Sequence, residues 1–491
     1  MIPTSVEEAA AQVIARSPAF AGTAALDALR AVEYARLDAS GLAYLDYTGG
    51  SLHAASQVAA HAAVLSERVL GNPHSVSPSS HAATTLVEEA RRAVLDYFEA
   101  DDRYTAIFTL NASGALKLVG EAFPFSPDGG LLLTFDNHNS VNGLREFASA
   151  RRAPVSYIPL TLPELRLDLA SMRAQLATPS TASRLFAFPA QSNFSGVKHP
   201  LSIVAEAQAA GWRVLLDAAA FVPTNRLSLR DVQPDFVTLS FYKMFGYPTG
   251  VGALLVRRDA LSVLQRPWFA GGTVNFATVQ GRSHVLSDGE AGFEDGTLDY
   301  LGIPAVTIGL RHLQRVGVEQ IHARVQGLTA WLIDQLLALV HTNGRPMVRI
   351  YGPTRMVDRG ATITLNLYDP EGRLLDYRRL EELAGARGLA LRTGCFCNPG
   401  AGEAAESLTE ADMHLAATLG DDITLARFVA LMEARGGKAA GAVRVSFGIA
   451  SNVSDALRFL HFVADLRDQT RLSLGAATFD IASCRVIRDG A

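Results

Sequence analysis

The chain has 491 residues, of which 48% are hydrophobic and 19% are charged, a balance typical of folded globular proteins rather than disordered ones. Its formal net charge of −5 implies no basic face and argues against a nucleic-acid-binding protein. No apolar run is long enough to span a membrane, and residues 1–8 are acidic where a secretory signal is basic, so we expect a cytoplasmic protein.

Residues 104–256 alternate short apolar runs with longer amphipathic segments, the pattern of parallel strands joined by helices. The expected strands share a short, apolar sequence: 104–110, 131–135, 184–188, 213–216, 236–239 and 251–256. Helices are expected between them, for example over 116–123 and 202–210. This pattern predicts an α/β sheet covered on both faces, with ligands bound beyond the carboxyl ends of its strands.

A second domain is expected after Gly302, because the chain exceeds the size at which one hydrophobic core stops growing. Residues 303–340 have apolar positions at helical spacing and predict a long helical connector. Beyond it we expect short strands and helices in alternation: strands 349–351, 361–367 and 443–447, and helices 377–386 and 422–433. Residues 401–419 are the least patterned segment and are expected to form a mobile loop.

Two motifs directly follow expected strands. Ser113 and Gly114 open a helix, and small residues at a helix N-terminus leave backbone amides available to a phosphate, although most such sequences are plain helix starts. His138 is placed to stack on a cofactor ring and to relay protons, whereas a loop histidine is more often simply solvated. In this order along the chain, we favour the functional interpretation of His138.

Asp217 ends one expected strand, and Lys243 follows the next. A carboxylate there would keep a pyridine nitrogen protonated, which makes a pyridoxal ring an electron sink. A partly buried lysine forms imines readily, because burial disfavours its charge. Taken singly, Asp217 is better interpreted as a helix cap and Lys243 as a surface lysine. Their separation of 26 residues (243 minus 217) is about one strand–helix–strand unit, so together they indicate a pyridoxal site, with Ser240 near its phosphate.

Three cysteines, Cys395, Cys397 and Cys484, are too few for a disulfide framework and lack the partners of a zinc site. A disulfide between Cys395 and Cys397 would be strained, so we expect free thiols. Cys397 lies in the glycine-bounded loop 394–400, 154 residues (397 minus 243) after Lys243. A Schiff-base lysine followed by a loop thiol suggests an enzyme that takes sulfur from an amino acid. The alternative is a structural cysteine, which burial would support.

Further phrases extend from about residue 40 to the C-terminus: GNPHS at 71–75, ALKLV at 115–119, DNHNS at 136–140, PAQSNFSG at 189–196, SFYK at 240–243, FEDGT at 293–297, RTGCFCNPG at 392–400 and VRVSFG at 443–448. In this order they resemble the class V aminotransferase group of fold-type I pyridoxal-phosphate enzymes. Within that group the chain is similar to the cysteine desulfurases, and most closely to the desulfurase domain of the molybdenum cofactor sulfurases.

The resemblance implies that Lys243 binds pyridoxal 5'-phosphate as a Schiff base and that Asp217 pairs with its pyridine nitrogen. His138 would stack on the ring, and Asn193 would lie near the phenolic oxygen. The phosphate would be bound by small side chains and helix amides: Ser113, Gly114, Ser240 and, from the neighbouring subunit of the family's homodimer, Thr297 of the Gly296-Thr297 element.

The resemblance also implies a reaction, the conversion of L-cysteine to L-alanine with a persulfide on Cys397 that passes to an acceptor. Arg444 matches the arginine that binds the substrate carboxylate, Arg392 is a second candidate, and Asn193 lies beside the substrate. Lys243, His138 and Cys397 are the expected catalytic residues.

Three departures from the family pattern leave questions open. Ala220 stands where many desulfurases have glutamine, whose contact Asn193 is a candidate to supply. Cys395 competes with Cys397 as nucleophile, and we favour Cys397 by its match to the family. The eukaryotic molybdenum cofactor sulfurases continue into a further domain, whereas this chain ends at Ala491. The acceptor stays open among the molybdenum cofactor, a carrier protein and a biosynthetic pathway, and so does the choice between cysteine and selenocysteine.

The implied fold is α/β and of fold-type I, with a mostly parallel seven-stranded sheet between helices in a large domain and a smaller α+β C-terminal domain. We expect residues 1–40 to pack with the small domain, 41–305 to form the large cofactor-binding domain, and 306–491 to form the connector helix and small domain. Another class V enzyme that does not use Cys397, such as a C–S lyase, aminotransferase or epimerase, is the alternative. A non-catalytic relative is disfavoured, because Lys243 and Asp217 are both present.

Overall fold

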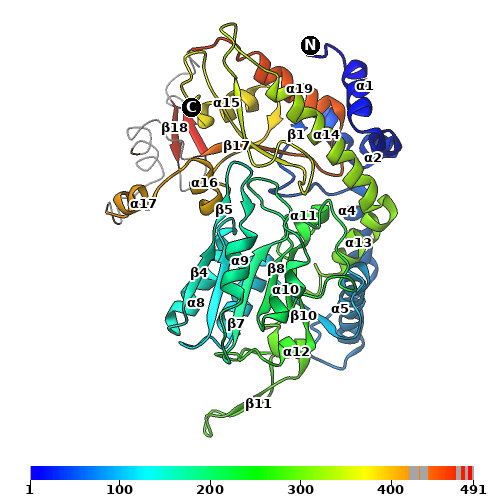
Figure 1. Cartoon of the computed structure of the whole chain (residues 1–491). Coiled ribbons are helices and arrows are strands. Elements are labelled where there is room, and N and C mark those ends of the chain that lie inside the picture. The colour runs from blue at the N-terminus through cyan, green and yellow to red at the C-terminus, as the bar shows by residue number, and fades with distance from the viewer. Residues whose placement is uncertain are drawn as a thin grey trace.

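A seven-stranded sheet lies at the centre of the larger part of the molecule (Figure 1). The structure, a computed structural model, describes residues 2–418, 420, 431, 441–470, 477–480 and 485–488. The strand order is β2-β10-β9-β8-β7-β3-β4, and β10 alone in this sheet is antiparallel to its neighbours. The strands are β2 (Tyr104–Thr109), β3 (Gly130–Thr134), β4 (Val155–Ile158), β7 (Arg184–Pro189), β8 (Arg213–Asp217), β9 (Phe236–Ser240) and β10 (Gly252–Arg257). The predicted α/β fold with a mostly parallel seven-stranded sheet is confirmed.

The six strands predicted in this sheet are all present, and β4 is the strand that the sequence did not predict. It lies at the edge of the sheet, where Ser156 is exposed and Val155 and Tyr157 are only partly buried. An edge strand needs no continuous apolar run, and β4 therefore lacks the signal by which the central strands were found.

Hydrophobic side chains of the sheet alternate between two clusters, one on each face. On β8, Leu215 packs in one cluster, and Val214 and Leu216 pack in the other. Helices that cover the sheet are α5 (Pro78–Tyr97), α6 (Ala112–Ala122), α8 (Leu144–Ala150), α9 (Leu169–Leu176), α10 (Ile203–Ala209), α12 (Arg258–Leu261) and α13 (Pro304–Val316). Burial on both faces explains why these strands read as apolar runs.

A second, antiparallel sheet has the order β13-β14-β17-β16. Its strands are β13 (Val348–Tyr351), β14 (Thr362–Leu367), β17 (Ala442–Ser446) and β16 (Arg392–Gly394). The helices of this part are α14 (Val318–Leu337), α15 (Tyr377–Ala386), α16 (Pro399–Ala405), α17 (Glu410–Ala417) and α19 (Val453–Ala464), and α1 (Val6–Arg16) contacts α14 and α19. The domain boundaries at residues 40 and 305 stay a prediction.

Two expectations for this part need correction. The connector over 303–340 is two helices, α13 and α14, because Gly317 between them has a φ of +84° and ends the first. The expected loop 401–419 contains most of α16 and all of α17, since Asn398 caps α16 and Pro399 begins it. The expected helix 422–433 lies outside the described residues apart from Leu431.

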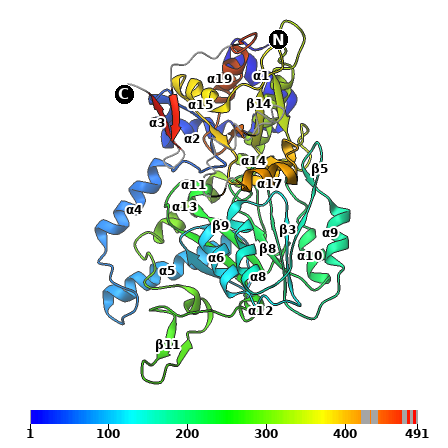
Figure 2. The same cartoon turned by 90° about the vertical axis from the view of Figure 1, so that its left-hand side faces the viewer.

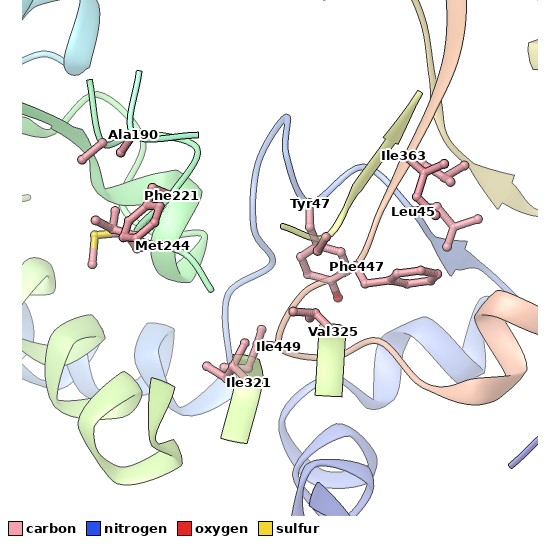
Figure 3. Close-up of a cluster of buried hydrophobic side chains, with 14 of the residues drawn as sticks. Leu45, Tyr47, Ala190, Phe221, Met244, Ile321, Val325, Ile363, Phe447 and Ile449 are labelled. Atoms are coloured by element: carbon pink, nitrogen blue, oxygen red, sulfur yellow. The ribbon is translucent and has the colours of Figure 1, made fainter. Parts of the chain in front are cut away.

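The segment that follows α3 (Ala35–Ala39) joins the two parts of the molecule. Its strand β1 (Ala43–Tyr44) pairs in parallel with β15 (Leu389–Ala390), and Asp46 forms a bridge with Ser446. Figure 3 shows the cluster of hydrophobic side chains beside it, drawn from both parts: Leu45, Tyr47, Ala190, Phe221, Met244, Ile321, Val325, Ile363, Phe447 and Ile449. The two sheets therefore share one continuous core.

A hairpin of β11 (Val274–Ala277) and β12 (His284–Leu286) extends away from the rest of the molecule (Figures 1 and 2). The remaining short elements are η1 (Pro18–Thr23), α2 (Ala25–Glu33), α4 (Ala55–Glu67), α7 (Asn139–Asn142), β5 (Leu160–Thr161), β6 (Arg166–Leu167), α11 (Phe241–Phe245), η2 (Gly289–Phe293), β18 (Ala477–Asp480) and β19 (Arg485–Arg488). Across the described part of the chain, none of the helices is both long and apolar enough to cross a membrane.

Candidate active site

The carboxyl ends of β3, β7, β8 and β9 meet at one cavity of about 120 Å³. Most side chains that the sequence predicts for cofactor binding line it: Ser113, His138, Asn193, Asp217, Ser240 and Lys243. Gly114 and Thr297 instead line a second cavity of about 310 Å³. The topology thus brings together residues that are as much as 130 positions apart (243 minus 113) in the sequence.

Asp217 presents one of its carboxylate oxygens to the cavity. Its Oδ1 accepts hydrogen bonds from the backbone N–H of Ala219 at 3.1 Å and from Thr238 Oγ1 at 3.3 Å. Within the described residues, Oδ2 has no hydrogen-bond partner. The residue is 8% exposed, and a buried carboxylate with an open acceptor calls for a cationic or protonated donor.

Lys243 lies on α11, a five-residue helix that ends at Gly246 in the left-handed conformation (φ +79°). A Cβ at Gly246 would lie 2.3 Å from the backbone nitrogen of His53, so glycine is needed for this close approach. Burial lowers the pKa of the Lys243 amine, and this effect outweighs the opposing charge of Asp217. The lower pKa increases the neutral, nucleophilic fraction of the amine.

His138 caps α7, and its Nδ1 accepts a hydrogen bond from the backbone N–H of Ser140 at 3.1 Å. Burial lowers the pKa of His138, and the positive charge of Lys243 lowers it further. A neutral ring with an accepting Nδ1 carries its proton on Nε2. His138 is therefore placed as a neutral group with one N–H to donate.

The N-terminus of α6 meets Ser240 beside the cavity. The backbone N–H of Ala112 donates to Ser240 Oγ at 2.9 Å, and Asn111 Oδ1 accepts from the N–H of Gly114 at 3.0 Å. Ser113 Oγ lies 2.6 Å from Ser140 Oγ and is exposed. Hydroxyls and a helix N-terminus at one spot are suited to bind an anion such as a phosphate.

The two arginines predicted to bind a carboxylate lie on neighbouring strands, β16 and β17, and share an acidic partner, Asp46. Arg444 donates to Asp46 Oδ1 at 2.8 Å and to the carbonyl oxygen of Asn193 at 3.1 Å. Arg392 donates from Nε to Asp46 Oδ2 at 2.8 Å. Burial lowers the pKa of Arg444, and the negative charge of Asp46 acts in the opposite direction. Sequence reasoning missed Asp46, although an acidic residue between an apolar run and Gly49-Gly50 was a usable signal.

The loop that carries Cys397 is held in an unusual conformation. Phe396 and Cys397 have φ values of +55° and +54°, in the left-handed region, and the thiol of Cys397 is free and exposed. The ring of Phe396 covers the guanidinium group of Arg444 at 4.7 Å. The exposure of Cys397 argues against a structural cysteine, and both described cysteines, Cys395 and Cys397, are free as expected, whereas Cys484 lies outside the described residues.

Asparagine side chains bind this loop to the large sheet. Asn398 Nδ2 donates to the carbonyl oxygen of Asp136 at 2.7 Å and to Asn193 Oδ1 at 2.8 Å, and Asn193 Nδ2 donates to the carbonyl oxygen of Phe396 at 2.8 Å. The N–H of Asn139 donates to the carbonyl oxygen of Cys397 at 2.7 Å. The amide of Asn193, expected near a ring oxygen, is thus engaged by the loop.

Gln191 is a further polar residue of the cavity, which it lines beside Ala220. It is 3% exposed, and it follows β7 as Asp217 ends β8. A glutamine was expected to be missing here, since Ala220 replaces the one found in many desulfurases. Gln191 lay within a phrase already quoted for the resemblance, but only the structure shows that it lines the same cavity as Ala220.

Comparison with known proteins agrees with this geometry. The family model described as Aminotransferase class-V matches residues 43–459. The chain belongs to this family. It is 36% identical to molybdenum cofactor sulfurase of Solanum lycopersicum over 475 residues, which are 89% of the chain and 57% of that protein. It is 36% identical to the human (Homo sapiens) molybdenum cofactor sulfurase, covering 91% of the chain and 52% of that protein.

The chain therefore spans little more than half the length of the curated relatives it matches. Among solved structures, an apo cysteine desulfurase of Thermococcus onnurineus NA1 has the same fold, with a TM-score of 0.72 and 22% identity. The match covers 89% of this chain and 97% of that one. The predicted fold-type I architecture and the resemblance to class V aminotransferases are thereby confirmed.

Proposed function

We propose that the protein is a pyridoxal-phosphate-dependent cysteine desulfurase, which converts L-cysteine to L-alanine and passes sulfur from Cys397 to an acceptor. The observation that carries this proposal is the exposed thiol of Cys397, whose loop is hydrogen-bonded to Asn193 of the cavity and covers the Arg444 guanidinium group with the Phe396 ring. The pKa of Lys243, lowered chiefly by burial, is raised by the charge that Cys397 carries when ionised, which supports their proximity.

The residues present fit pyridoxal phosphate. The open Oδ2 of Asp217 can accept a hydrogen bond from a protonated pyridine nitrogen, and the Lys243 amine can form an imine with the aldehyde. The end of the cavity where Ser240 meets the N-terminus of α6 can bind the phosphate. Ala219 and Ala220 leave room for a flat ring. When bound, the cofactor supplies an electron sink for the pair released at the substrate Cα.

The chain's own residues supply the rest of the mechanism. Arg444, with Arg392 beside it, holds the substrate carboxylate, and Lys243 in its neutral form, which the lowered pKa favours, takes the Cα proton. The Cys397 thiolate then attacks the substrate sulfur. An S–S bond forms as the Cβ–S bond breaks, and the electron pair of that bond stays on Cβ, which gains a proton. Lys243 then returns a proton to Cα, and the product is alanine.

We also propose a homodimer in which Thr297 of the second copy completes the phosphate site. Thr297 is exposed in the single chain and lines the second cavity rather than that of Lys243. The residues before it carry exposed apolar side chains that a second copy would cover: Trp268, Phe269, Phe276, Val279 and Val285.

The acceptor is part of the same proposal. The names of the relatives make the molybdenum cofactor the first acceptor to test, with a carrier protein or a biosynthetic pathway as the others. A cytoplasmic location, the choice between cysteine and selenocysteine, and the division into residues 1–40, 41–305 and 306–491 stay predictions.

Product analysis separates the desulfurase from the alternative class V reactions. Purified protein with L-cysteine and a reductant should yield alanine and sulfide in equal amounts. Cys397→Ala should abolish both products, whereas Cys395→Ala, which changes the neighbouring exposed thiol, should retain them. Pyruvate as the product, or activity that survives Cys397→Ala, would favour a C–S lyase instead.

A further inference from the structure

Asp46 divides its carboxylate between the two arginines that we propose to bind the substrate carboxylate. Its Oδ1 accepts from Arg444, and its Oδ2 accepts from Arg392 Nε at 2.8 Å and lies 2.7 Å from a terminal nitrogen of the same guanidinium group. Asp46 and Arg444 are almost fully buried, at 7% and 3% exposure, whereas about half of the Arg392 side chain is exposed. Charge-assisted bonds to a buried carboxylate hold both guanidinium groups in a fixed orientation.

The backbone around Asp46 keeps this carboxylate in place. Asp46 forms a bridge with Ser446, two residues after Arg444, and its carbonyl oxygen accepts from the N–H groups of Gly49 and Gly50 at 3.0 and 3.1 Å. A Cβ at Gly49 would lie 2.5 Å from Asp46 Oδ2, so only glycine allows the chain to turn so closely around the carboxylate. Asp46 is therefore part of the site and not a mobile surface group.

The charges of this cluster match one substrate carboxylate. Two guanidinium groups and the Asp46 carboxylate leave a net charge of +1 (two minus one), which the α-carboxylate of an amino acid neutralises. Arg392 begins β16, which leads into the loop of Cys397, so a substrate whose sulfur meets Cys397 would extend its side chain toward Arg392. Because Asp46 neutralises Arg392, an acidic substrate side chain finds no free cation there.

We propose that Asp46 is a positioning residue that also determines substrate specificity: it aligns Arg444 and Arg392 and restricts the site to amino acids with a single carboxylate. This inference rests on the proposed function in one respect, the use of Arg444 to bind the α-carboxylate. It does not depend on sulfur transfer.

Binding of L-alanine and L-aspartate to the holoenzyme tests the proposal, with the absorbance of the bound cofactor as the readout. Neither ligand contains sulfur, so the measurement stays valid if desulfurase activity is absent. Arg392→Gln, the wild type and Asp46→Asn form a series in which the cluster carries 0, +1 and +2 charges. The ratio of the Kd of aspartate to that of alanine should fall at each step, by about tenfold per charge at low salt.

Asp46→Glu is the matched control, because it keeps the charge and changes only the length of the side chain. It should weaken the binding of both amino acids and keep the wild-type ratio. An unchanged ratio across the charge series would overturn the proposal, and so would an equal change in Asp46→Glu and Asp46→Asn.

Three further outcomes are informative. If Asp46→Asn does not fold, Arg392→Gln against the wild type still tests the trend, since the Arg392 side chain is half exposed. A wild-type holoenzyme that binds no L-alanine would overturn the inference together with the role of Arg444. A lack of alanine formation from L-cysteine, with the trend in the ratios intact, would contradict the desulfurase alone.

Discussion

Lys243 is the residue on which the proposed chemistry depends most. Its amine faces the cavity with a pKa lowered by burial, and within the described residues it forms no hydrogen bond or ion pair. Lys243→Ala should reduce alanine formation by about 10²- to 10⁴-fold or more, the contribution of a positioned proton-transfer group. Lys198→Ala is the control, because burial also lowers the pKa of Lys198, which lies outside the cavity. Equal losses in the two variants would contradict the assignment.

His138 gives a prediction about pH. Its pKa is lowered by burial and by Lys243, so just below its ordinary value of about 6.5 the unfolded chain binds more protons than the folded one. The free energy of unfolding therefore rises with pH through this window, and the contribution is lost as the pH falls. His138→Asn should become progressively more stable relative to the wild type between about pH 7.5 and 5.5. Urea unfolding of both proteins at several pH values measures the difference in their free energies of unfolding. A difference that stays the same at every pH would contradict the prediction.

Among single residues, those at the ends of strands could be predicted from the sequence, whereas those that depend on pairing with distant residues could not. Asp217 and Lys243 were found because each lies at the end of an apolar run, and the cavity brings both together. Asp46 was missed because its partners lie 346 and 398 residues away along the chain. The position of Asp46 before Gly49-Gly50 is a local signal, but its pairing with these arginines depends on the bridge between Asp46 and Ser446, which the local sequence does not show.

Helix α16 begins directly after the Cys397 loop, so a change in α16 should alter the position of the thiol. A Cβ at Gly400 would lie 1.9 Å from the carbonyl oxygen of Phe135, whereas one at Gly402 would meet only an ordinary contact at 3.9 Å. Gly400→Ala should therefore displace the loop, with a cost of about 1–3 kcal/mol in the free energy of unfolding and a large loss of alanine formation.

Gly402→Ala is the matched control within the same helix. It should leave both the stability and the rate close to those of the wild type. Thermal unfolding and the rate of alanine formation measure the two effects. Equal behaviour of the two variants would contradict the packing of α16 against the end of β3.

Buried strands could be predicted from the sequence better than edge strands and short helices. Strands buried on both faces, such as β8 and β9, are continuous apolar runs and were found with bounds that differ by about one residue. The edge strand β4 and the short helices α16 and α17 have no such run. Their positions are determined by neighbours and by caps such as Asn398, which are not visible in hydrophobic periodicity.

At the scale of the whole molecule, the candidate site lies between two sheets with different tasks. The seven-stranded sheet presents Asp217 and Lys243, and the four-stranded sheet presents Arg444 and the loop of Cys397. The shared core of Figure 3 holds the two parts together. The resemblance predicted that the large domain binds the cofactor and that the small domain carries the Cys397 loop. The hydrogen bonds of Asn193 and Asn398 that join this loop to the large sheet are visible only in the structure.

The proposed homodimer predicts complementation between subunits. Lys243→Ala and Thr297→Val chains should each be impaired, but a mixed dimer of the two has one site with both residues intact. Random reassembly of equal amounts should restore about a quarter of the wild-type sites, because half of the dimers are mixed. Alanine formation before and after reassembly measures this recovery. No recovery in dimers shown to be mixed would contradict a Thr297 contribution from the partner.

The most direct test of the central claim is to locate sulfur on the protein after a single turnover. The holoenzyme would be mixed with less than one equivalent of L-cysteine, without reductant, and its peptides mapped by mass spectrometry. We predict one additional, reducible sulfur atom on Cys397 and an equal amount of alanine. Alanine without sulfur on Cys397, or sulfur on Cys395 alone, would contradict the account.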